Sequence, residues 1–229
     1  MSRDSGDLPS LLQDASGPIV ASRAVSPELR ASLRSSGRDD IVVRPTVRGR
    51  TVWGDVSNAV VVIEQPNWFG RPEVLPAAGV VVLVDQAAGA CFDATAGPHF
   101  VRDGAANGIV ACSSLRSEEA VADRRQGHSE ATTQARRLAL LGGQVPGFRL
   151  AHGKPRSPVF VAMFPIDPHR VTSALAGSVG VSAAPAGPRF PDLPGGVRIR
   201  VDAAASEQDL RDWMVAADEI VRSGKRLES

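Results

Sequence analysis

The chain has 229 residues, of which 43% are hydrophobic, and its 26 basic and 25 acidic side chains leave a formal net charge of +1. This length suffices for one large domain or for a larger and a smaller one, each with an apolar core and no need of a disulfide framework. The basic residues are interspersed with acidic ones, which argues against a nucleic-acid-binding protein, and no apolar stretch approaches the ~18 residues of a membrane helix.

Residues 1–17 are polar, acidic and without apolar periodicity, so we expect them to form a disordered leader. Because they do not have the pattern of a secretion signal, we expect the protein to be cytoplasmic. After the leader, short apolar runs alternate with helix signals. Five runs predict strands, at 18–22, 41–43, 58–65, 80–85 and 108–114. Pro27 is placed to open a helix over 27–36, and a second helix is expected over 118–141. The run at 80–85 is apolar throughout, as in a parallel strand that is covered on both faces.

The second part of the chain has a different pattern. It predicts a β-α-β-β unit with a strand at 158–166, a helix at 167–177 and strands at 179–185 and 196–202. Ser206 and Asp209 then mark the start of an amphipathic helix whose apolar side belongs to the core. Because a Pro- and Gly-rich stretch separates the two parts, we expect a large domain over 18–150 and a small α+β domain over 151–229.

Three segments carry a resemblance to a known family: ASRAVSPELRASLRS (21–35), VVVIEQPNWFG (60–70) and VVLVDQAAGACF (81–92). In order and style they resemble the pyridoxal-phosphate (PLP) domain of the glycine decarboxylase P-protein of the glycine cleavage system. The third is also similar to the pattern of ornithine, lysine and arginine decarboxylases. The resemblance implies fold type I, an α/β domain with a mostly parallel sheet and helices on both faces, here as an incomplete PLP-transferase large domain.

The resemblance also assigns cofactor-binding positions. Asp85, at the end of a predicted strand, corresponds to the carboxylate that keeps the PLP ring nitrogen protonated. Asn67 belongs to the turn that is similar to the family's QPNFFG motif. On the next predicted strand, Ser113, Ser114 and Arg116 align with the family's hydroxyl residues and its PLP-binding lysine. From the local sequence alone, Asp85 is equally well explained as a turn cap and Arg116 as a surface arginine.

Arginine at position 116 changes the expected chemistry. A lysine amine loses its proton when it is desolvated and then attacks the cofactor aldehyde, whereas a guanidinium stays protonated and cannot form the Schiff base. The only lysines are Lys154, in a loop-like segment, and Lys225, near the C-terminus, and both are expected to be solvated. No catalytic residue is therefore predicted, and the cysteines and histidines lack the spacing of a metal site.

Three functions remain open at this stage. In the first hypothesis the chain is a degenerate or accessory P-protein-like polypeptide, which forms the non-catalytic half of a two-chain enzyme. Alternatively, it is a PLP-dependent decarboxylase or transferase subunit that a lysine-bearing partner completes. In the third hypothesis it is a regulatory module that holds an anionic ligand through Arg116. A decayed gene product without activity is a further alternative. We expect a homo- or hetero-oligomer, for example with a lysine-bearing PLP subunit, and PLP, where it binds, is not held as a Schiff base by this chain alone.

Overall fold

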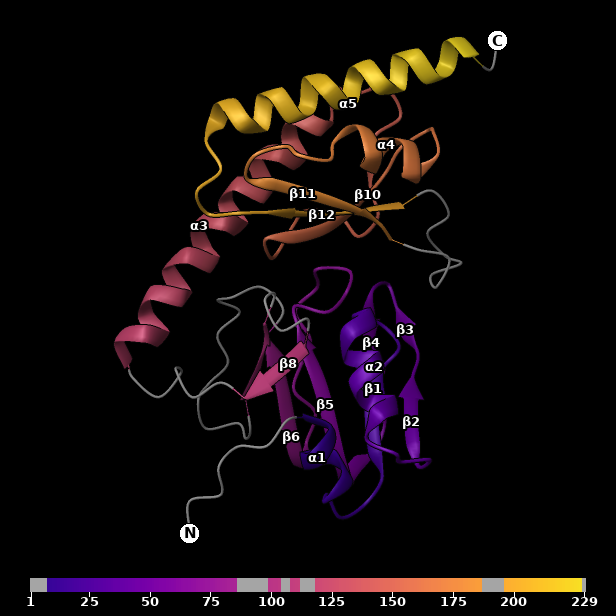
Figure 1. Cartoon of the computed structure of the whole chain (residues 1–229), viewed down its shortest axis with the longest axis vertical. Helices are drawn as coiled ribbons and strands as arrows, with labels where there is room; N and C mark the ends of the chain where they lie inside the picture. Colours follow the sequence, from indigo (N-terminus) through magenta and orange to yellow (C-terminus); the bar gives the residue numbers. More distant parts are fainter. Residues whose placement is uncertain (1–7, 86–98, 104–107, 112–117, 187–195, 228–229) are drawn as a thin grey trace. The chain divides into compact units, whose positions relative to one another are not determined.

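The computed structural model describes residues 8–85, 99–103, 108–111, 118–186 and 196–227. By their internal contacts the residues form two compact units, Met1–Gln126 and Gly127–Ser229. The boundary therefore falls earlier than the predicted one after residue 150. The reason lies in the second half of α3 (Glu118–Gly142), where Ala135 and Leu138 belong to the core of the second unit. Figure 1 shows both units in the colours of the sequence.

The first unit is built on a six-stranded sheet. Its strands are β1 (Ile19–Ser22), β2 (Ile41–Arg44), β5 (Val56–Gln65), β6 (Ala78–Asp85), β7 (His99–Asp103) and β8 (Gly108–Ala111). Their order is β2-β1-β5-β6-β7-β8, and all neighbouring pairs are parallel except β7 with β8. The α/β class and the mostly parallel sheet are thus confirmed. Strand β7 was not predicted.

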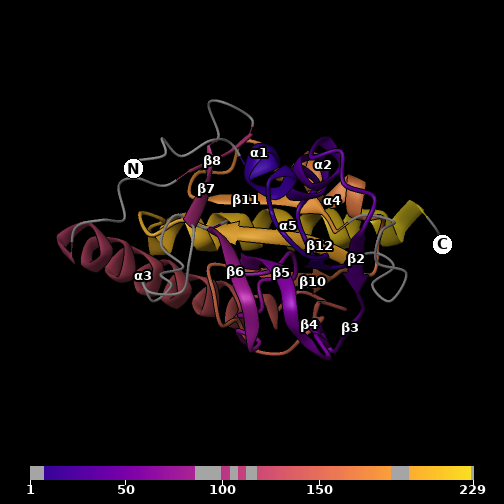
Figure 2. The same ribbon diagram turned by 90° about the horizontal axis from the view of Figure 1, so that it is seen from below.

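Two helices, α1 (Leu8–Gln13) and α2 (Pro27–Ser35), lie side by side on one face of this sheet, as seen in Figure 2. Leu12 and Leu29 pack there against valines of β5 and β6. The other face has its own cluster, in which Trp53 covers Val61 and Ile63. Trp53 follows the small hairpin of β3 (Thr46–Val47) and β4 (Arg50–Thr51). A sheet buried on both faces explains why β5 and β6 read as nearly continuous apolar runs.

The start of α2 follows its sequence signals. The Ser26 hydroxyl accepts a hydrogen bond from the Leu29 amide at 3.1 Å, and Pro27 occupies the first helical position. The helix begins where these residues predicted it.

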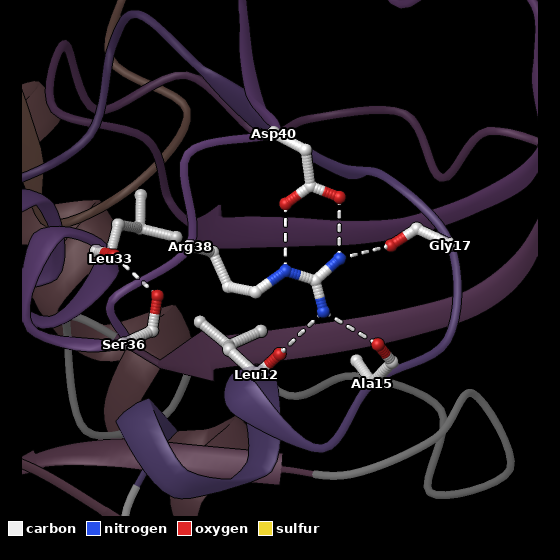
Figure 3. A network of polar contacts seen from close by, with 7 residues as sticks. All are labelled: Leu12, Ala15, Gly17, Leu33, Ser36, Arg38 and Asp40. Atoms are coloured by element: carbon white, nitrogen blue, oxygen red, sulfur yellow. Dashed lines mark hydrogen bonds and ion pairs between the residues drawn. The ribbon is translucent and has the colours of Figure 1, made fainter.

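An arginine clasp attaches α1 to this unit, although residues 1–17 were predicted to be disordered. The Arg38 guanidinium donates to the main-chain oxygens of Leu12, Ala15 and Gly17, at 3.3, 2.6 and 2.7 Å, and also to both carboxylate oxygens of Asp40 (Figure 3). All five of its N–H donors are used in this way. The hydrogen bonds from Arg38 hold the pKa of Asp40 below its usual range. Part of the predicted leader is therefore an ordered element.

The second unit contains a four-stranded antiparallel sheet of order β11-β12-β10-β9. Its strands are β9 (Arg149–Leu150), β10 (Val159–Met163), β11 (Val181–Pro185) and β12 (Gly196–Val201), and its helices include α4 (Pro168–Ala174) and α5 (Glu207–Leu227). Figure 1 shows α4 and α5 on the same side of this sheet, where Trp213 and Leu210 of α5 enter the core. The small α+β domain and the order of its elements are confirmed, apart from the short β9.

Helix α5 begins with a reciprocal cap. The Ser206 amide donates to Asp209 Oδ2 at 2.8 Å, and the Asp209 amide donates to Ser206 Oγ at 3.1 Å. Each side chain thus satisfies a main-chain donor of the other residue, as in a capping box. The predicted start of the last helix is therefore correct.

Candidate functional site

The carboxyl ends of β1, β5 and β6 meet at one edge of the first sheet, because these strands are parallel. The strands end at Ser22, Gln65 and Asp85, and Gln65 pairs with Asp85 in the register of β5 and β6. Ligands of open parallel sheets bind outside this edge. We therefore take it as the candidate site. The Asp85 side chain itself lies outside the described part of the structure.

Five polar side chains form what we call the carboxyl-edge network: Ser22, Thr51, Gln65, Asn67 and Glu73. Its centre is the buried carboxylate of Glu73. The Thr51 amide donates to Glu73 Oε2 at 3.1 Å, while the Thr51 hydroxyl and Asn67 Nδ2 contact Glu73 Oε1 at 2.7 and 2.6 Å. Three donors thus replace the water that a buried carboxylate loses.

Asn67, which is fully buried, uses its whole hydrogen-bonding capacity inside the protein. Its Nδ2 group donates to Gly49 O at 2.8 Å and to Glu73 Oε1, and its Oδ1 accepts from the amides of Phe69 and Arg71 at 3.1 and 3.0 Å. An amide side chain offers two donors and two acceptor positions, and all four are occupied. Asn67 shapes the turn and has no hydrogen bond left to offer a ligand.

The rest of the network fixes the neighbouring main chain. Gln65 forms a pair of bonds with Glu73: its Nε2 donates to Glu73 O and its Oε1 accepts from the Glu73 amide, both at 2.8 Å. Thr51 Oγ1 lies 2.6 Å from Ser22 Oγ. The turn closes at Gly70, whose φ of 73° suits glycine. The network joins the ends of β1 and β5 to the segment before β6.

Strand β8, the last strand of the first sheet in chain order, precedes the position that aligns with the family's PLP-binding lysine. Strand β7 lies between β6 and β8, the strand predicted at 108–114. Strand β8 runs antiparallel to β7, with Asp103 opposite Gly108 and Phe100 opposite Ala111. Asp103, at the end of β7, therefore lies toward the same edge as Asp85, whereas β8 runs from that edge toward the opposite one. Ser113, Ser114 and Arg116 follow β8 and lie outside the described residues.

The predicted site residues thus have different outcomes. The structure places Asn67 and the main chain of Asp85 at one sheet edge, and it leaves Ser113, Ser114 and Arg116 undescribed. Sequence reasoning did not single out Glu73 or Thr51, which organise this edge. Both stand in segments without apolar periodicity, so a single sequence held no signal for them.

A covalently held PLP does not fit the residues of the first unit, because residues 1–126 contain no lysine. Lys154 lies exposed in the loop between β9 and β10, and Lys225 belongs to α5, so both are part of the second unit. The described side chains at the sheet edge also form their hydrogen bonds with one another. We therefore derive no reaction step through this cofactor.

Two further classes of feature were sought in the described ranges. No group of three or more His, Cys, Asp or Glu side chains there is arranged to hold a metal ion. Within the same ranges, no helix has both the length and the apolar character needed to cross a membrane.

No protein-family model matches the chain, and no curated protein matches its sequence. Solved structures do match. A glycine decarboxylase P-protein of the glycine cleavage system, in an inhibitor-bound form, is 19% identical at a TM-score of 0.70, with 93% of this chain and 67% of that chain covered. A NifS-like protein from Rickettsia africae is 10% identical at a TM-score of 0.64, over 94% and 79% of the two chains. A structure of SPT with a PLP internal aldimine is 14% identical at a TM-score of 0.61, and the match covers 96% of this chain and 70% of that chain.

These matches share one fold, that of PLP-dependent enzymes of fold type I. Decarboxylase, desulfurase-like and transferase structures all occur among them. At such low identity the likeness shows the fold alone. The resemblance inferred from three short segments is thus confirmed at the level of the fold.

Proposed function

We propose that this chain is an accessory P-protein-like polypeptide: it has the fold of PLP-dependent enzymes but forms no Schiff base of its own, and it pairs with a lysine-bearing chain. The observation that carries the proposal is the composition of the first unit. This unit contains the parallel sheet and the edge at Asp85, yet residues 1–126 include no lysine. A nucleophilic amine is the one group that covalent PLP chemistry requires of the protein.

Arginine at position 116 supports the same view. A guanidinium remains protonated at any physiological pH, so it cannot attack an aldehyde, although it can bind an anion by two parallel hydrogen bonds. The internal bonding of Asn67 and Glu73 adds to this argument. These side chains stabilise the sheet edge as a rigid surface, which suits a subunit that supports a partner.

A borohydride experiment tests the proposal. The purified chain is incubated with PLP, reduced, digested and mapped by mass spectrometry for lysines that carry the phosphopyridoxyl group. We expect only trace labelling at Lys154 and Lys225, unchanged in the Asp85→Asn variant, because that variant removes the carboxylate that would hold the cofactor ring. Stoichiometric labelling of either lysine that disappears in Asp85→Asn would overturn the proposal.

Repeating the experiment with a co-expressed partner separates the two subunit hypotheses. The partner to choose is a lysine-bearing P-protein-like chain encoded by a neighbouring reading frame. If the present chain is accessory, the label appears on a lysine of the partner at a site whose residues all come from that partner. Loss of that label when Asp85 is changed to Asn would instead show a composite site to which this chain contributes.

A further inference from the structure

A groove of about 560 Å³ lies in the first unit between α2 and the edge strand β2. Arg23, Arg30 and Arg34 line it, and the carboxylate of Asp39 stands among them. We call this feature the arginine groove. Its volume falls in the range of small-molecule pockets. It is distinct from the carboxyl-edge network, with which it shares only Ser22.

The arrangement of the arginines points to a ligand rather than to stabilisation of the fold. Arg30 and Arg34 are four residues apart on α2 and so occupy the same side of the helix, where like charges destabilise it. Arg30 Nη2 donates to Arg23 O at 3.0 Å, which brings the segment after β1 next to the helix. The Arg23 and Arg34 side chains have no hydrogen-bond or ion-pair partner among the residues that the structure describes.

Arg38, which also borders the groove, is a different case. All five of its N–H donors are taken by main-chain oxygens and by Asp40, whose carboxylate balances its charge (Figure 3). It therefore adds no donor for a ligand. The guanidinium groups of Arg23 and Arg34 stand against the single carboxylate of Asp39, so the groove has an excess of positive charge.

Apart from Ser22, the remaining wall of the groove is apolar. Val25 and Leu33 are buried at its floor, and Ile41 and Val43 of β2 form its side. Val43 is 58% exposed, so apolar surface faces the solvent directly beside the guanidinium groups. A ligand that matches both features has a dianionic group and an apolar body.

We propose that the arginine groove binds a small phosphate ester with an apolar body, its phosphate held by Arg34 together with Arg23 or Arg30. Phosphate offers three oxygens at the spacing of guanidinium N–H groups, so two arginines contact it bidentately. This assignment does not depend on the accessory role proposed above, because neither Asp85 nor a lysine takes part.

Phenyl phosphate is the probe, and binding to the full chain is measured by isothermal titration calorimetry. We expect saturable binding that is weakened at least about tenfold by Arg34→Gln and also by raised salt, as for a charge-assisted contact at a solvent-accessible site. Arg50→Gln is the matched control, since it removes an exposed arginine of β4 in the same unit, and it should leave the affinity unchanged. Inorganic phosphate should bind more weakly than phenyl phosphate, because it lacks the apolar body.

Three outcomes would refute the assignment. These are the absence of saturable binding, equal weakening by Arg34→Gln and Arg50→Gln, or equal affinity for phenyl phosphate and inorganic phosphate. If phenyl phosphate does not bind but a glutamate-rich peptide does, the first of these outcomes also identifies the groove as a peptide site. Circular dichroism of each variant checks that the fold is intact, as expected for exposed side chains.

Discussion

The two units bury their apolar residues in different ways. The first unit divides its apolar residues between the two faces of a parallel sheet, and its sheet edge is organised by buried polar side chains such as Glu73 and Asn67. The second unit collects its apolar residues into one cluster, which includes Trp213 and Phe164. The carboxyl edge of the first unit therefore depends on specific hydrogen bonds, whereas the core of the second depends on close packing. The carboxyl-edge network and the arginine groove both belong to the first unit.

The largest effect should come from the packed core of the second unit. Trp213 is 1% exposed and lies edge-on to Phe164, with ring centroids 6.4 Å apart. We expect Trp213→Ala to lower the free energy of unfolding by about 3–5 kcal/mol, measured by chemical denaturation. Among the described residues the indole Nε1 has no hydrogen-bond partner, so Trp213→Phe should cost much less. Equal losses in the two variants would show that packing is not the main contribution.

The second-largest loss of stability is expected at the carboxyl-edge network of the first unit. Asn67→Ala removes one donor to the buried Glu73 carboxylate and leaves the amides of Phe69 and Arg71 without their acceptor. We expect a loss of about 2–3 kcal/mol in unfolding free energy. The control is Asn58→Ala, at an exposed asparagine of β5, which should change stability by less than about 0.5 kcal/mol. A loss at Asn58 as large as that at Asn67 would contradict this account of the network.

A smaller effect is expected at the arginine clasp. Arg38→Gln removes the bonds to Leu12, Ala15 and Gly17, and it should cost about 1–2 kcal/mol because the side chain is partly exposed. Limited proteolysis should then cut near residues 13–17 much faster than in the original chain. Arg34→Gln, one helical turn earlier in sequence, is the control and should leave the cleavage rate unchanged. If both variants are cut equally fast, the clasp does not hold α1.

The smallest effect should be a dependence on pH through His128 in α3. Burial lowers the pKa of this imidazole, so the folded protein favours the neutral form. Between the unfolded pKa of about 6.5 and the lower folded value, the unfolded chain binds more protons, and stability falls as the pH is lowered. Denaturation midpoints at pH 7.5 and 5.5 should therefore differ more in the original chain than in His128→Gln. An unchanged pH dependence in the variant would exclude His128 as the source.

Local signals predicted the elements that local chemistry determines. Ser26 with Pro27 placed the start of α2, and Ser206 with Asp209 placed the start of α5, because a cap is formed by residues adjacent in sequence. The apolar run at 80–85 likewise predicted strand β6, in which Val82 and Val84 are buried and which ends at Asp85.

Contacts between distant residues account for what the sequence did not reveal. Helix α1 is held by Arg38, more than twenty residues away, and by the burial of Leu8 and Leu12 against the sheet. Its six residues are too few to show a periodicity of their own. Strand β7, with the sequence HFVRD, has charges instead of a clear alternation. The role of Glu73 depends on Thr51 and Asn67, which reach it from separate turns.

The arginine clasp also bears on how the start of the chain tolerates substitution. Its three contacts to the α1 segment are all with main-chain oxygens, which every amino acid possesses. The side chains at positions 13–16 can therefore be exchanged without loss of these contacts. Gly17 is the exception, since its φ is +91° and a Cβ atom there would lie 2.8 Å from Asn58 O. Homologues should accordingly vary in this segment while retaining a glycine at its end and an arginine opposite.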